Sequence, residues 1–159
     1  MKIKTRNGLK IEFYELLIVE GNDGYFKFLQ DLLGKIGLTL VTEGSPSAPR
    51  EFNIHRCTAI ADAINKLDDD PVPYDAVLVS NRSLVAVLVG NPSIKHAKRD
   101  AIESVIKFAG AAPVLLLTTM AQDEDIRECL AAGVMHCVSL WDVRDKGPQL
   151  LVDAILFAT

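Results

Sequence analysis

Three short apolar runs, each closed by a polar residue, constrain the fold of this chain most. They are Leu16–Glu20, Tyr74–Ser80 and Val114–Thr118. Each has the length of a buried strand, and segments with helical apolar spacing separate them. Buried strands that alternate with helices predict a parallel sheet covered by helices on both faces. The polar ends Glu20, Ser80 and Thr118 should then meet at the carboxyl edge of the sheet, where such folds collect their functional groups.

Two further segments, Phe52–Cys57 and Met135–Leu140, are predicted as core strands, which completes about five strand–helix units. Leu38–Glu43 is also predicted as a strand, forming an extra hairpin with Phe52–Cys57. The run Leu84–Val89 is apolar at every position, and it fits a buried helix, an added strand or an association surface.

The first thirteen residues precede this pattern. Asn7-Gly8 lies between two alternating segments, and both residues tolerate a positive φ, which predicts a β-hairpin or arm over residues 1–13. The main domain is predicted over residues 14–159.

Composition excludes several function classes. A net charge of -4 favours neither nucleic acid nor an anionic membrane as partner, and no apolar run reaches the roughly 18 residues of a membrane span. The three cysteines and three histidines lack metal-ligand spacing, so we expect no metal, no cofactor and reduced thiols in a cytoplasmic protein.

The most specific segment is Ala112–Val138, with the sequence APVLLLTTMAQDEDIRECLAAGVMHCV. Together with LLIVEGN and YDAVLVS, it resembles the receiver domain of bacterial two-component response regulators. The resemblance spans about residues 14–159. It implies a flavodoxin-like (βα)5 three-layer sandwich with a parallel five-stranded sheet of order 2-1-3-4-5, here with an N-terminal extension and the extra hairpin before strand 2.

The resemblance also locates five positions of the family's phosphorylation site. The acidic pair that holds Mg²⁺ falls on Glu20 and Gly21, the phosphoacceptor Asp on Ser80, the hydroxyl on Thr118 and the Lys on Leu140. Only Thr118 matches outright, and Glu20 matches in part. Mg²⁺ prefers carboxylates, and phosphoryl transfer needs a nucleophile and a neutralising cation. We therefore expect no catalytic residue, and a chain that is not an enzyme.

These departures predict a pseudo-receiver, a regulatory domain that signals by protein contacts without Asp phosphorylation. Its expected partner is a signalling protein or a C-terminal effector domain, and a homodimer is expected through the family's helix 4–strand 5–helix 5 face. The candidate interface residues there are Cys129, Met135, Cys137, Trp141 and Leu151.

Two alternatives remain. In the first, the altered pocket near Glu20, Ser80 and Thr118 still binds a phosphoryl group, a metal or a small ligand. The second is a flavin- or nucleotide-binding enzyme on the same fold, but the sequence has no glycine-rich phosphate-binding motif to support it.

Overall fold

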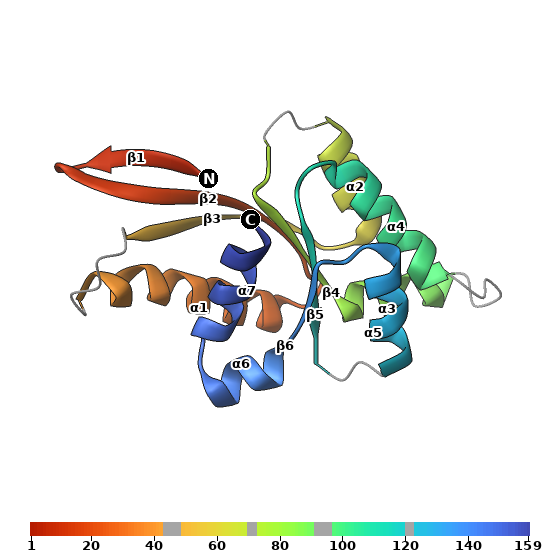
Figure 1. The fold of residues 1–159 in the computed structure, drawn as a ribbon. Coiled ribbons are helices and arrows are strands. Elements are labelled where there is room, and N and C mark those ends of the chain that lie inside the picture. The colour runs from red at the N-terminus through yellow and green to blue at the C-terminus, as the bar shows by residue number, and fades with distance from the viewer. Residues whose placement is uncertain (43–48, 70–72, 91–96, 120–122) are drawn as a thin grey trace.

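The computed structural model describes residues 1–42, 49–69, 73–90, 97–119 and 123–159 (Figure 1). The elements in chain order are β1 (Lys2–Arg6), β2 (Leu9–Val19), α1 (Asp23–Thr42), β3 (Arg50–Cys57), α2 (Ile60–Asp69), β4 (Ala76–Ser80), α3 (Asn81–Gly90), α4 (Ala97–Ala109), β5 (Val114–Thr118), α5 (Asp123–Ala132), β6 (His136–Ser139), α6 (Leu140–Lys146) and α7 (Gln149–Ala158).

The core sheet has five parallel strands in the order β3-β2-β4-β5-β6. In the count of the core strands alone this is 2-1-3-4-5, so the predicted flavodoxin-like topology is confirmed. The choice of Phe52–Cys57 as the second core strand is confirmed too, because it forms most of β3.

Helices cover both faces of the sheet, as apolar strands require (Figure 1). One core cluster joins the sheet to α1, α6 and α7 and includes Leu16 and Ile18. The other joins it to α2, α3, α4 and α5 and includes Leu17 and Val19. Successive residues of β2 thus enter opposite cores, which is why the strand is apolar at every position.

The N-terminal segment forms the predicted hairpin. β1 pairs antiparallel with the first residues of β2, and Asn7 and Gly8 make the turn with φ values of 50° and 79°. All five residues of β1 are exposed. β2 continues without a break into the core, so the expected boundary between residues 13 and 14 falls inside one strand.

The extra hairpin before the second core strand is a wrong prediction. Residues 38–42 continue α1, and residues 43–48 lie outside the described part of the chain. Gly34 lies inside α1, where a glycine costs only about 1 kcal/mol. Its φ is not in the left-handed range that ends a helix, so the backbone hydrogen bonds continue past it.

Two ambiguous segments are also settled by the structure. The described backbone of Leu84–Val89 lies in α3, so the helix alternative is the correct one. The last core strand ends at Ser139, and Leu140 already begins α6 with Ser139 as its N-cap. None of the helices in the described residues combines the length and apolarity needed to cross a bilayer.

Candidate functional site

Four polar side chains are buried at the carboxyl edge of the sheet, where sequence analysis expected a site. They are Glu20, Ser80, Ser83 and Thr118, exposed by 1%, 2%, 6% and 6%. The strand register places them together, because Val19 pairs with Val79 and Ser80 pairs with Leu117. The structure thus brings Glu20, Ser80 and Thr118 to one edge.

Ser80 caps a helix. α3 begins at the next residue, and the Ser83 backbone N–H donates to Ser80 Oγ at 3.2 Å, the geometry of an N-cap. The two serine hydroxyls lie 2.9 Å apart, and Ser83 Oγ donates to the Val19 carbonyl at 3.3 Å. The hydroxyl at the phosphoacceptor position is therefore engaged in holding the β4–α3 junction.

Glu20 is held by its own turn. Its Oε1 accepts a hydrogen bond from the Asn22 backbone N–H at 3.0 Å. Its backbone amide donates to the Cys57 carbonyl at 3.0 Å, and its carbonyl accepts from Arg56 Nε at 3.1 Å. Glu20, which the resemblance places at a Mg²⁺-binding position, thus supports the turn that leads into α1.

Gly21 has no room for a side chain. A Cβ built on it would lie 2.8 Å from the Thr58 carbonyl oxygen, closer than Cβ atoms approach backbone. The carboxylate that the resemblance would place here is therefore excluded by main-chain packing as well as by the residue itself.

Thr118 and Leu140, the other two positions that the resemblance assigns to the site, also contact neighbouring elements of the fold. Thr118 Oγ1 donates to the Val138 carbonyl on the neighbouring strand at 3.5 Å. Leu140 is 5% exposed and belongs to the core beneath α6 and α7. An apolar side chain thus fills the place where a receiver keeps a cation, and it supplies no charge to a transferring phosphoryl group.

Two residues outside the set predicted from the sequence, Asn81 and Ser83, also lie at this edge. Both border a cavity of about 520 Å³ that also touches Glu20, Gly21 and Arg82. Asn81 Oδ1 is buried there without a hydrogen-bond partner in the described structure. The sequence does carry a signal for this cap: two serines stand three residues apart after an apolar strand. The side chain of an N-cap residue accepts a hydrogen bond from the backbone N–H three residues later.

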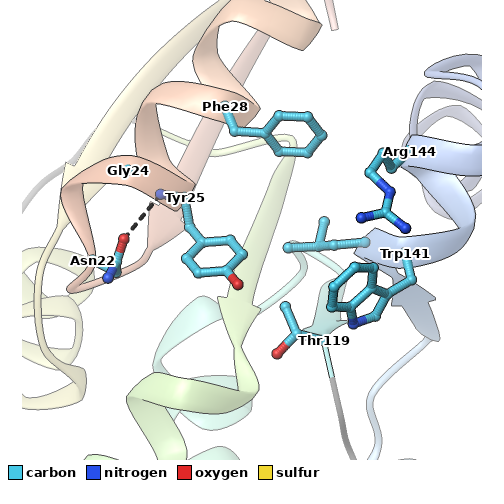
Figure 2. A pocket seen from close by; sticks show the side chains of 8 residues that line it. Asn22, Gly24, Tyr25, Phe28, Thr119, Trp141 and Arg144 are labelled. Atoms are coloured by element: carbon cyan, nitrogen blue, oxygen red, sulfur yellow. Dashed lines mark hydrogen bonds between the residues drawn. The ribbon is translucent and has the colours of Figure 1, made fainter.

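A second cavity, of about 310 Å³, lies between α1 and α6 (Figure 2). Tyr25 and Phe28 of α1 face Trp141 and Arg144 of α6 across it, and Leu140 also lines it. We call it the aromatic cleft; Asn22, Gly24 and Thr119 complete its lining.

The position of the cleft follows from local structure. Asn22 caps α1, because its Oδ1 accepts a hydrogen bond from the Tyr25 backbone N–H at 3.0 Å. Ser139 caps α6, the helix that carries Trp141 and Arg144, because its Oγ accepts from the Asp142 backbone N–H at 3.4 Å. The Arg144 guanidinium lies 4.2 Å from the Trp141 ring centroid, and Arg82 lies 4.1 Å from that of Tyr25.

Two of the predicted interface residues are inside the molecule. Cys129 is 3% exposed and Leu151 is fully buried, so neither side chain can contact a partner. They lie on the inward stripes of α5 and α7, where apolar burial outweighs exposure. Met135 and Trp141 are exposed by 52% and 43%, as an interface requires, and Cys137 is partly buried.

Burial affects the thiols of two of the three cysteines. Burial raises the pKa of the Cys57 and Cys137 thiols, which keeps them protonated at neutral pH. Among the residues that the structure describes, no three His, Cys, Asp or Glu side chains gather as a metal site would require.

No protein-family model matches this chain, and no curated protein matches it in sequence. Solved structures do match. A pilus assembly-related protein of Burkholderia pseudomallei is similar with a TM-score of 0.62 and 18% identity, over 91% of this chain and 88% of that one.

Two receiver domains match over similar lengths. The receiver domain of a sensor histidine kinase of Pseudomonas aeruginosa, which holds a magnesium ion in its active-site cleft, has a TM-score of 0.56 and 19% identity over 89% of this chain and 97% of its own. A CheY-like receiver domain of Methanospirillum hungatei has a TM-score of 0.59 and 14% identity, over 92% and 93%. The chain therefore has the CheY-like fold of response regulator receiver domains.

Proposed function

We propose that this chain is a signal-transduction regulatory domain of the pseudo-receiver kind, which acts through protein contacts and takes no phosphoryl group. One observation carries the proposal: the residue at the phosphoacceptor position, Ser80, is a buried helix cap whose hydroxyl is bound by Ser83. A hydroxyl in that role needs a base to become a nucleophile, and its cap bonds would break if it reacted.

The surroundings of Ser80 support the same conclusion. A receiver-type Mg²⁺ site needs carboxylate oxygens around the ion, and the phosphoryl group needs a cation opposite. Here the Thr58 carbonyl leaves no room for a side chain at position 21, and Leu140 is buried among apolar side chains. Metal, nucleophile and cation are thus lost together while both cores of the fold are complete.

A contact surface remains on the face that receivers use for partners. β6 pairs only with β5 among the described strands, so it forms an edge of the sheet. Exposed apolar side chains lie around it: Leu130 of α5 is 45% exposed, Met135 is 52% exposed and Phe157 of α7 is 82% exposed. Such a group of exposed apolar residues favours a protein interface.

The fold alone does not define the output. The CheY-like fold occurs both in the histidine kinase receiver and in the pilus assembly-related protein. We therefore propose a signalling protein, a C-terminal effector domain or a second copy of the chain as the partner, and a cytoplasmic location.

An NMR amide-shift titration of the chain tests the missing chemistry. We expect millimolar Mg²⁺, and then beryllium fluoride as a mimic of aspartyl phosphate, to leave the amides around Glu20, Ser80 and Thr118 unmoved. Sodium chloride at equal ionic strength is the control for screening. Saturable shifts at that edge would mean that the pocket still switches, and they would overturn the proposal.

One observation favours the alternative of a ligand in the altered pocket. The cavity of about 520 Å³ borders Glu20, and the buried Asn81 Oδ1 beside it has no partner in the described structure. A buried acceptor of this kind is usually satisfied by water or a ligand. Such an acceptor beside the Glu20 carboxylate suits a hydrogen-bond donor or a cation, so if a metal ion occupies this cavity, Mg²⁺ should shift the Asn81 side-chain amide signals in the same NMR experiment.

A further inference from the structure

The aromatic cleft has the composition of a ligand site. Its volume of about 310 Å³ falls at the lower end of the range for small-molecule pockets. Tyr25 and Phe28 form one wall, and Trp141 forms the other (Figure 2). The Trp141 side chain is 43% exposed, although a ring of that size gains free energy by being covered.

Leu140 stands where the receiver resemblance expects a Lys, and Trp141 follows it directly. Both now line the cleft. Loss of the cation at position 140 therefore leaves an apolar surface next to the aromatic walls.

The charges around the cleft decide which ligand fits. Three aromatic rings around a cavity would suit a quaternary ammonium ion. Here Arg144, which lines the cleft, already lies 4.2 Å from the Trp141 ring centroid, and Arg82, which lines the neighbouring cavity, lies 4.1 Å from that of Tyr25. They repel a cation and attract an anion. Arg144 pairs with Asp145 at 3.1 Å, but both side chains are more than half exposed, so this pair is weak and exchangeable.

From this geometry we propose that the aromatic cleft binds a small aromatic carboxylic acid. Its ring lies between the α1 wall and Trp141, and its carboxylate pairs with the Arg144 guanidinium, a planar fork that matches a carboxylate. The Asn22 and Thr119 side chains, which also line the cleft, can hydrogen-bond further polar groups of the ligand.

The test uses phenylacetate as the probe and NMR as the readout. Trp141 is the only tryptophan, so its indole N–H gives a single resonance from the cleft wall. We expect phenylacetate to shift this resonance and the amides of Tyr25 and Phe28 saturably, with the millimolar affinity that so small a ligand permits. Acetate lacks the ring and 2-phenylethylammonium carries the opposite charge, so both should shift them much less.

A pair of variants on α6 identifies the charge involved. Arg144→Gln should raise the Kd for phenylacetate roughly tenfold, the loss expected for one charge-assisted hydrogen bond. Lys146→Gln removes the same charge from a side chain that is 70% exposed and outside the cleft lining, and it should change the Kd by less than about twofold. The amide spectra show in the same samples that both variants are folded.

Three results would overturn the proposal: no saturable shift with phenylacetate, equal shifts with 2-phenylethylammonium, or equal effects of the two variants. The proposal does not depend on the pseudo-receiver function. The Mg²⁺ and beryllium fluoride titration reads the edge around Ser80, whereas phenylacetate reads Trp141, so either proposal can fail alone.

Discussion

At the scale of single residues, the positions that the receiver resemblance assigns to a phosphorylation site make structural contacts in this chain. Gly21, Ser80 and Leu140 each stand where the receiver resemblance expects a reactive group. A backbone carbonyl leaves no room for a side chain at Gly21, Ser80 caps α3, and Leu140 packs in one of the two cores. Placing the receiver's reactive side chain at any one of these positions would therefore disrupt a packing contact or a helix cap.

Gly21 gives the sharpest prediction. Gly21→Ala should lower the free energy of unfolding by about 1–3 kcal/mol, the usual cost of overpacking, because its Cβ would meet the Thr58 carbonyl at 2.8 Å. Gly34→Ala is the control: the site lies within α1, nothing lies within 4 Å of an added Cβ, and a gain of about 0.5–1 kcal/mol is expected. Urea denaturation of both variants measures the difference, and equal stabilities would contradict it.

Ser80 is predicted to matter for stability. Ser80→Ala removes the oxygen that accepts from the Ser83 N–H and should cost about 1 kcal/mol of unfolding free energy. Ser139→Ala makes the matched change at the more exposed cap of α6, where the bond is 3.4 Å long, and should cost less. Thermal or urea unfolding would refute the cap role if Ser80→Ala were neutral.

At the scale of elements, β2 serves two structures. Its first half pairs with β1 in the exposed hairpin, and its second half lies between β3 and β4 in the core sheet. The hairpin should therefore open locally while the core stays folded, because no apolar core depends on β1.

The Asn7-Gly8 turn tests this independence. Gly8 has a φ of 79°, and an alanine there costs roughly 1 kcal/mol or more. Gly8→Ala should speed amide hydrogen exchange in β1 roughly tenfold while β4 exchanges at its original rate. Asn7→Gly tolerates the turn and should leave both unchanged. Unchanged or slower exchange in β1 would contradict the predicted strain at the turn, and faster exchange in β4 would show that the hairpin and core are coupled.

At the scale of the whole molecule, one core packs on each face of the sheet. Among the described strands, β6 pairs only with β5 and so forms an edge of the sheet. Phe157 is 82% exposed beside this edge, and its ring centroid lies 5.6 Å from that of His136. A side chain of this size at an open sheet edge favours association.

We predict that the chain self-associates through this face. Phe157→Glu should weaken the dimer roughly tenfold or more, because it places a charge in an apolar contact. Phe108→Glu is the control, on α4 across the sheet, where the ring is 38% exposed. Sedimentation velocity at increasing concentration measures both. A chain that stays monomeric at every concentration would refute self-association, and equal weakening by the two variants would place the interface elsewhere.

Much of the fold was predictable because its signals are local. The apolar runs ending at Glu20, Ser80 and Thr118, the Asn7-Gly8 turn and the helical spacings specify strands, a hairpin and helices through backbone and burial preferences. The failed strand at 38–42 shows the limit: β-branched residues favoured a strand, and continuation of α1 overrode them.

By itself, then, the sequence determined the order of strands and helices and the departure of this chain from the receiver residues at Gly21, Ser80 and Leu140, because both depend on residue type and spacing. Only the tertiary structure decided that position 21 has no room for a side chain and that Ser80 caps α3. It also decided that Cys129 and Leu151 are buried and that an aromatic cleft lies between α1 and α6. These features depend on distances between segments far apart in the chain, which spacing along one strand or helix does not encode.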